Sequence, residues 1–139
     1  MMSGMIKQLS HVCIHCADLQ ATRRFYEGLL GLPVKFIFEK EGRLFGLYFE
    51  AGNGSFIEAF ERRDSRPAGS PHHFCFEVES IDELAVVLDR EGVPHREKKR
   101  GADQSWQLWT EDPDGHPFEF QEYTPQSSQY TGATCRVDW

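Results

Sequence analysis

The chain contains an internal repeat, and this repeat constrains the fold more than any other feature of the sequence. The segment HVCIHCADL begins at His11, and HFCFEVESI begins at His73, 62 residues later. Each segment alternates like a strand and is followed by a helix-like segment that ends at a Gly-x-Pro motif. The two motifs, Gly31-Leu32-Pro33 and Gly92-Val93-Pro94, are 61 residues apart. Two copies of one unit are expected to fold as similar modules related by a pseudo-twofold axis.

Each copy is predicted to contain one strand, one helix and three further strands. Asp18 is the expected N-cap of the first helix, and Ser80 and Glu83 form a capping box for the second. The turn Gly52-Asn53-Gly54 is typical of a hairpin, and Asp112-Pro113-Asp114-Gly115 is typical of a tight turn. The predicted strands lie near 9–16, 34–40, 43–50 and 55–61 in the first copy, and near 73–78, 94–100, 105–111 and 117–123 in the second.

This pattern predicts an α+β fold built from tandem βαβββ modules. We expect two curved sheets that form a half-barrel cavity, with the helices outside. The first module spans 5–62 and the second 69–124, and together they make one domain. Residues 125–139 are polar and are expected to form an arm or a loose tail, in which Trp139 has no evident role.

Length and charge limit the class of protein. A chain of 139 residues can form one domain that buries roughly two-thirds of its unfolded surface. Its formal net charge of −7 argues against nucleic acid and anionic membranes as partners. No apolar run approaches the ~20 residues of a membrane span, and the first residues, MMSGMIKQL, lack a signal-peptide core. We therefore expect a cytoplasmic protein that acts on a small molecule.

One histidine and one glutamate recur at matching places in the two copies. Glu58 and Glu119 each stand four residues after the glycine of a predicted turn. Strand alternation places His11 and His73 on the face away from the helix, which is the face that would line the cavity. Two neutral imidazoles and two carboxylates balance a divalent ion, and an octahedral ion with four protein ligands keeps two positions for water or substrate. The sequence therefore predicts a divalent-metal centre held by four residues: His11, Glu58, His73 and Glu119.

The other histidines and the cysteines have structural explanations. His72 competes with His73, but the repeat alignment favours His73, and strand alternation points His72 the other way. Cys13 and Cys16 have the spacing of half a zinc ribbon, yet they point to opposite faces of one strand and lack a second pair. These two and Cys75 are expected to be small buried residues in a reducing compartment. Three histidines have no repeat partner of the same type, and we expect them to be structural residues and not ligands: His15, His95 and His116.

Four stretches of the sequence resemble the glyoxalase/bleomycin-resistance/extradiol-dioxygenase superfamily, also called the vicinal oxygen chelate proteins. They are LSHVCIHCADLQATRRFYEGLLGLPV, SFIEAF, HHFCFEVESIDEL and EDPDGHPFEFQEY, and the resemblance covers residues 5–124. In members similar to glyoxalase I, the metal ligands fall at the positions of His11, Glu58, His73 and Glu119. The resemblance implies one divalent ion per site, with nickel or zinc favoured and cobalt, manganese or iron as alternatives.

The same resemblance implies a metal-dependent lyase or isomerase of the glyoxalase I type. The substrate would be a hemithioacetal of methylglyoxal and glutathione, bound to the metal through vicinal oxygens. Glu119 would be the preferred base for proton transfer between adjacent carbons, with Glu58 as the second catalytic carboxylate. The resemblance also implies a homodimer. Some glyoxalases have a basic residue for glutathione four places after the first ligand; here that residue is His15, and the candidates to compensate are Arg23, Arg24 and Arg43.

Two other functions within the superfamily stay open. Extradiol dioxygenases and thiol transferases that act on fosfomycin resemble the chain at His11, His73 and Glu119, a set that binds iron or manganese. The additional Glu58 argues against them because it fills a position that oxygen or substrate needs. A non-enzymatic binding protein of the bleomycin type fits the negative charge, but buried carboxylates are costly without a cation. The aromatic residues that could line a pocket or belong to the core are Phe36, Phe45, Tyr48, Trp106 and Trp109.

Overall fold

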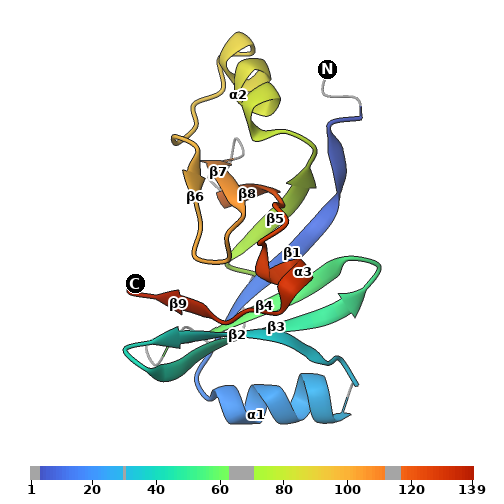
Figure 1. The fold of residues 1–139 in the computed structure, drawn as a ribbon, viewed down its shortest axis with the longest axis vertical. Coiled ribbons are helices and arrows are strands. Elements are labelled where there is room, and N and C mark those ends of the chain that lie inside the picture. Colours follow the sequence, from blue (N-terminus) through green and yellow to red (C-terminus); the bar gives the residue numbers. More distant parts are fainter. Residues whose placement is uncertain (1–3, 30, 63–70, 112–116) are drawn as a thin grey trace.

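A single curved sheet of nine strands dominates the computed structural model, which describes residues 4–29, 31–62, 71–111 and 117–139 (Figure 1). The strand order is β6-β7-β8-β5-β1-β4-β3-β2-β9, and the sheet curls into a half-barrel. The predicted α+β fold is therefore confirmed. The strands are β1 (Ile6–Cys16), β2 (Val34–Lys40), β3 (Arg43–Gly52), β4 (Ser55–Glu61), β5 (His73–Val78), β6 (Lys99–Arg100), β7 (Trp106–Glu111), β8 (Pro117–Glu122) and β9 (Cys135–Val137).

The two copies of the repeat form equivalent halves of this sheet. In the first half β1 runs parallel to β4, and in the second half β5 runs parallel to β8. The central strands β1 and β5 pair with each other in antiparallel fashion. This pairing joins the two expected sheets into one, so side chains from both modules face the same hollow.

Helices α1 and α2 cover the outer, convex side of the sheet. Helix α1 (Leu19–Arg23) begins after Asp18, whose carboxylate accepts hydrogen bonds from two backbone N–H groups. It continues as a π-helix, η1 (Arg24–Leu29), where the sequence predicts one regular helix. Helix α2 (Ile81–Arg90) begins after Ser80, whose hydroxyl accepts from the N–H of Glu83, as a capping box requires. Figure 1 shows α1 and α2 at opposite ends of the molecule, each beside the strands of its own module.

The packing of the helices decides which strand residues face the cavity. Leu19 of α1 packs against Ala59 of β4, and Leu84 of α2 belongs to the same buried cluster as Phe120 of β8. Because neighbouring residues of a strand point to opposite faces, the residues just before Ala59 and Phe120 must point into the cavity. These residues are Glu58 and Glu119.

The second module departs from its predicted strands at one place. The strand expected at 94–100 is reduced to the two residues of β6, preceded by an isolated bridge between His95 and Thr110. Pro94 has no N–H to give to a ladder, and its carbonyl accepts a hydrogen bond from the Thr110 hydroxyl instead. The predicted turn at 112–115 and His116 lie outside the described residues.

The C-terminal residues pack against the sheet. After β8 the chain forms α3 (Ser128–Thr131), and β9 then pairs in parallel with β2 of the first module. Ser128 and Cys135 are buried, and the Ser128 N–H donates to the carbonyl of Asp103 at 2.8 Å. In Figure 1 this red segment runs from the second module back across to the first. Residues 125–139 therefore link the two modules and contribute to the core.

None of the helices in the described part of the chain has the length and apolar character needed to cross a bilayer.

Candidate metal centre

Strand register brings the four predicted ligands to one place on the concave face. Glu58 of β4 lies opposite the residue two places after His11 in β1. Glu119 of β8 lies opposite the residue two places after His73 in β5. Residues two apart in a strand share a face, so each glutamate faces the same side as the histidine of its own module. The antiparallel pairing of β1 and β5 then sets the two histidines beside each other.

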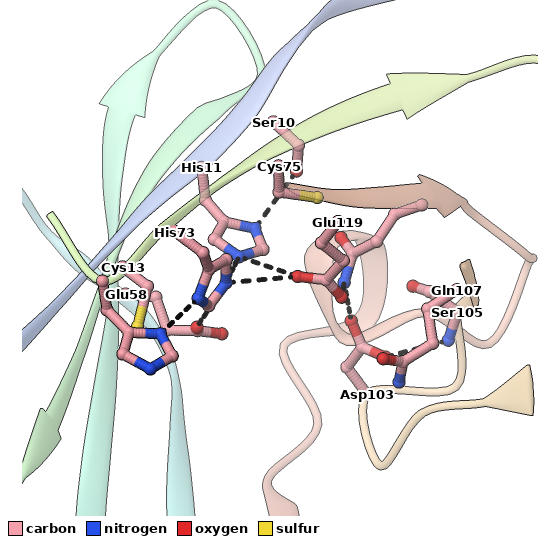
Figure 2. Close-up of polar contacts among 12 residues, drawn as sticks. Ser10, His11, Cys13, Glu58, His73, Cys75, Asp103, Ser105, Gln107 and Glu119 are labelled. Carbon is pink, nitrogen blue, oxygen red and sulfur yellow. Dashed lines mark hydrogen bonds and ion pairs between the residues drawn. The ribbon is translucent and has the colours of Figure 1, made fainter. Parts of the chain in front are cut away.

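The donor atoms of these side chains converge (Figure 2). The Nε2 atoms of His11 and His73 are 3.3 Å apart, and each is 3.3 Å from Oε2 of Glu119. Oε1 of Glu58 is 3.6 Å from Nε2 of His11 and 3.8 Å from Nε2 of His73. All four residues are buried, although none belongs to the apolar core. The structure therefore brings together every residue of the predicted site.

The spacing of the donors fits a divalent metal ion. Ligand atoms about 2.1 Å from one ion are separated by roughly 3.0–3.4 Å in octahedral or tetrahedral geometry. The separations within the trio His11, His73 and Glu119 fall in this range, and this trio could hold a metal ion. Glu58 stands a few tenths of an ångström farther away, so a small side-chain movement would complete a set of four. Imidazole and carboxylate donors suit several divalent metals.

Without an ion, the charges of the site act on one another. Burial disfavours the charged form of His11, but the carboxylates of Glu58 and Glu119 outweigh it and raise the pKa of the imidazole to about 9. Burial acts on Glu119 too, but hydrogen bonds from His11 and His73 lower its pKa to about 2. Burial is the largest effect on Glu58 and raises its pKa. The two carboxylates therefore have different proton affinities despite their equivalent places in the repeat.

A hydrogen bond behind His11 orients its ring. The Tyr48 hydroxyl lies 2.8 Å from Nδ1 of His11, and Nε2 of Gln129 donates to the same hydroxyl at 3.5 Å. A neutral His11 whose Nδ1–H donates to Tyr48 presents its Nε2 lone pair to the other ligands. Partners of this kind fix the tautomer of metal-binding histidines and strengthen the site.

Asp103 connects the supports of Glu119 and His11. Nε2 of Gln121 donates to Glu119 at 3.0 Å and to Asp103 at 3.1 Å. The Asp103 carboxylate also accepts from Gln129 at 2.8 Å, and Gln129 contacts the Tyr48 hydroxyl behind His11. The repeat in the sequence does not point to this network. Strand alternation could have indicated Gln121, which lies two residues after Glu119 on the same strand, but no local pattern marks Asp103 or Gln129.

A cavity of about 440 Å³ opens above the four residues. Glu58, His73 and Glu119 belong to its lining, so substrate can approach the centre from this side. Trp109 contributes to the wall, and its ring and that of His73 pack in a T-shaped arrangement. Trp139, which the sequence left without a role, also lines the cavity. The remaining aromatic candidates belong to the core or pack against it: Phe36, Phe45, Tyr48 and Trp106.

His72 is closer to the centre than strand alternation predicts. It precedes the first residue of β5 and therefore does not follow the alternation of that strand. It lines the cavity, and its Nδ1 lies 2.8 Å from Nδ1 of His73. Cys13, His72 and His73 form a second group that could hold a metal. Burial raises the pKa of the Cys13 thiol far above its usual range, which disfavours the thiolate that a metal requires.

The other predicted residues lie as follows. All four cysteines are free, and Cys13, Cys75 and Cys135 are buried. His15 lines the cavity and stacks on His72, and His95 contacts Asp89. Among the described residues that line the cavity, the basic side chains are not the three proposed from the sequence, Arg23, Arg24 and Arg43. They are Arg62, Arg96 and Lys99.

Residues 8–120 match the family described as the glyoxalase/bleomycin resistance protein/dioxygenase superfamily. The fold and the paired βαβββ modules agree with this match. The chain belongs to this superfamily. Members of the superfamily typically bind a divalent metal ion, and the histidines and glutamates described above are groups that could hold one.

Solved structures with the same fold include enzymes of two kinds. Methylmalonyl-CoA epimerase from Mycobacterium tuberculosis is 18% identical with a TM-score of 0.75, over 91% of this chain and 94% of that one. A variant of the Streptomyces coelicolor methylmalonyl-CoA epimerase is 23% identical with a TM-score of 0.67, over 86% and 99%. A variant of homoprotocatechuate 2,3-dioxygenase from B. fuscum is 18% identical with a TM-score of 0.70, over 96% of this chain and 38% of that one. At these identities the likeness concerns the fold.

Proposed function

We propose that this protein is a metal-dependent enzyme that transfers a proton at a carbon beside two metal-chelated oxygens, as a lyase, isomerase or epimerase does. The observation that carries this proposal is the convergence of two imidazoles and two carboxylates at the floor of an open cavity. A bound divalent ion would stabilise the negative charge that develops on the substrate oxygens when the carbon loses its proton. The protein must then supply the proton acceptor.

Either carboxylate of the centre can serve as this acceptor. The family resemblance assigns the role to Glu119. The surroundings favour Glu58, because burial raises its pKa whereas the imidazoles lower that of Glu119 to about 2. A more basic carboxylate is the better proton acceptor near neutral pH. We therefore propose Glu119 as the firmly held ligand and Glu58 as the residue that moves the proton.

Two substrates test the proposal. The hemithioacetal of methylglyoxal and glutathione follows from the glyoxalase I-like resemblance, and methylmalonyl-CoA is named for the structural neighbour epimerases. The protein is loaded in turn with nickel, zinc and cobalt, and metal content is measured by elemental analysis. Proton exchange is followed by NMR as uptake of solvent deuterium at the substrate carbon. Near-stoichiometric metal together with exchange in one substrate supports the proposal; full loading without exchange in either contradicts it.

Matched glutamate variants separate the two roles. Glu119→Gln is expected to lose at least about tenfold in metal affinity, since it replaces a charged carboxylate donor by a neutral amide. Glu58→Gln should retain most of the metal affinity but lose about 100-fold or more in exchange rate. Glu77→Gln is the control, because Glu77 is also buried in β5 but contacts Lys7 and Gln8 away from the centre. If only Glu119→Gln loses proton exchange while its metal site is fully occupied, Glu119 is the base instead of Glu58.

Ring-cleaving dioxygenase or thiol-transferase chemistry is the second candidate. The tightest donor group is the trio His11, His73 and Glu119, a set of two histidines and one carboxylate that suits iron or manganese. Glu58 opposes this candidate because it occupies space next to the trio. Anaerobic loading with Fe²⁺, followed by catechol and oxygen, should give no oxygen uptake; rapid uptake would favour the dioxygenase. The homodimer and the glutathione adduct remain predictions of the glyoxalase I-like proposal.

A further inference from the structure

Three basic side chains line the cavity above the candidate metal centre. Arg62 follows β4 of the first module, while Arg96 and Lys99 belong to the segment before β7 of the second. No acidic side chain of the described part of the chain lies within ion-pair distance of them. Several cations elsewhere are paired with carboxylates, for example Lys7 with Glu77 at 3.1 Å and Lys98 with Asp82 at 3.0 Å.

Side chains alternate in direction along the extended segment at β6, so Lys99 points to the face opposite that of Lys98 and Arg100. Lys98 and Arg100 lie over the ring of Trp106, at 4.6 and 5.1 Å from its centroid. Lys99 stands between them, so its side chain extends to the other face and lines the cavity. Two basic residues on one side of the segment therefore serve packing, and one on the other side faces the substrate space.

The charge of the cavity favours an anionic ligand. Its lining contains three acidic residues and three basic ones. The carboxylates lie deep: Glu58 and Glu119 at the metal centre, and Asp103 among the amides of Gln121 and Gln129. A divalent ion would leave the lining with a formal charge of +2, although the whole chain carries −7. The exposed side chains of Arg96 and Lys99 would concentrate this positive charge at the mouth.

We propose that Arg96 and Lys99, with Arg62 of the same cavity lining, form a subsite for a carboxylate or phosphate group of the substrate. This inference rests on the proposed function, because the same substrate would chelate the metal centre through its oxygens. Arg96 and Trp109 also line a second hollow of about 930 Å³. An elongated substrate with an anionic group therefore fits better than a small neutral one.

A series of hydroxamates tests the subsite without catalysis. Acetohydroxamate chelates metals but carries no further charge, whereas succinohydroxamate adds a carboxylate and phosphonoacetohydroxamate adds a phosphonate. Binding is measured by absorption titration of the cobalt-loaded protein at low ionic strength. The compared proteins are wild type, the double variant Arg96→Gln/Lys99→Gln, and the control Lys98→Gln/Arg100→Gln, which removes the same charge from the same segment.

The anionic hydroxamates are expected to bind wild type and the control at least about tenfold more tightly than acetohydroxamate. In Arg96→Gln/Lys99→Gln the affinity of the anionic hydroxamates should exceed that of acetohydroxamate by about twofold or less. The affinity for acetohydroxamate itself should be unchanged. If only the phosphonate binds more tightly than acetohydroxamate, the subsite is assigned to phosphate. If both anionic hydroxamates bind more tightly, it is assigned to anions in general. The subsite is overturned if Arg96→Gln/Lys99→Gln still binds the anionic hydroxamates more tightly than acetohydroxamate, or if the control loses this preference to the same extent. Absence of acetohydroxamate binding would instead overturn the metal centre, and the subsite with it.

Discussion

Glu58 and Glu119 occupy equivalent positions in the two modules, but their surroundings differ. Both imidazoles contact Glu119 at 3.3 Å and Gln121 donates to it, so its negative charge is well stabilised. Glu58 is farther from the same imidazoles, and burial dominates its protonation. Duplication of a module therefore produces two equivalent carboxylates whose different contacts give them different proton affinities, which is the basis for the separate roles proposed for them.

Metal binding should depend on pH through His11. The metal-free protein holds a proton on this imidazole up to a pKa of about 9, and the ion must displace that proton. Apparent Zn²⁺ affinity is therefore expected to rise about tenfold per pH unit between about pH 7 and 9 and then to level off. Competition with a chromophoric chelator of known pH dependence measures this slope. A constant affinity from pH 7 to 9 would show that His11 is neutral before metal binds.

At the level of the elements, α3 connects the C-terminal arm to the metal centre. Gln129 of α3 donates to Asp103 and contacts the Tyr48 hydroxyl, which in turn contacts His11. The arm itself is held by pairing of β9 with β2. The C-terminal arm therefore supports a candidate ligand, His11, on the first strand.

Replacement of Gln129 should weaken metal binding although Gln129 is not a ligand. Gln129→Leu removes the donor to Asp103 and Tyr48, and the loss of such a support typically costs 10–100-fold in affinity. We expect a decrease of about tenfold in Zn²⁺ affinity, measured by chelator competition at pH 7.5. Gln126→Leu is the matched control, because Gln126 is exposed in the same arm. Equal affinities of both variants would mean that the network does not position His11.

Close packing of β3 against β4 makes one glycine necessary. A Cβ at Gly46 would lie 2.6 Å from Cδ1 of Phe60 and 2.9 Å from the carbonyl oxygen of Ala59. Gly46→Ala is therefore expected to lower the free energy of unfolding by about 1–3 kcal/mol in urea denaturation. Gly28→Ala, where a Cβ meets nothing within 4 Å, should change it by less than about 1 kcal/mol. Similar stabilities of the two variants would show that Phe60 moves aside at little cost.

At the scale of the whole molecule, the centre ties the two modules together. Its candidate ligands come from β1 and β4 of the first module and from β5 and β8 of the second. A bound ion would thus contact four strands on both sides of the pseudo-twofold axis. Because the sheet is continuous, we expect the modules to unfold as one unit.

Saturation with metal should stabilise the entire chain. At a free concentration of 100 times Kd, a ligand that binds only the folded state adds about 2.7 kcal/mol. For a domain of this size the melting temperature is expected to rise by roughly 5–10 °C in a single transition, measured by calorimetry. EDTA should reverse the shift, and Glu119→Gln should reduce it. Two separate transitions, of which metal moves only one, would contradict a centre shared by both modules.

The sequence by itself determined the modules and the residues that could carry chemistry. Alternation, capping and turn residues act within a few residues of one another, so they can be recognised locally, as at Ser80 and Asp18. The repeat singled out His11, Glu58, His73 and Glu119 because core packing does not require such residues at equivalent places. Their role as metal ligands stays a prediction that the convergence of their donor atoms supports.

Only the tertiary structure decided how the modules meet and what surrounds the centre. The pairing of β1 with β5 joins strands more than 50 residues apart, and no local pattern specifies it. The same holds for Asp103, Gln129 and the basic residues of the cavity, which the structure assigns differently from the sequence. A contact between distant segments depends on the packing of the whole chain, whereas a strand or a cap depends on its neighbours. This difference in range is the physical reason that the candidate ligands could be singled out from the sequence and the residues that surround them could not.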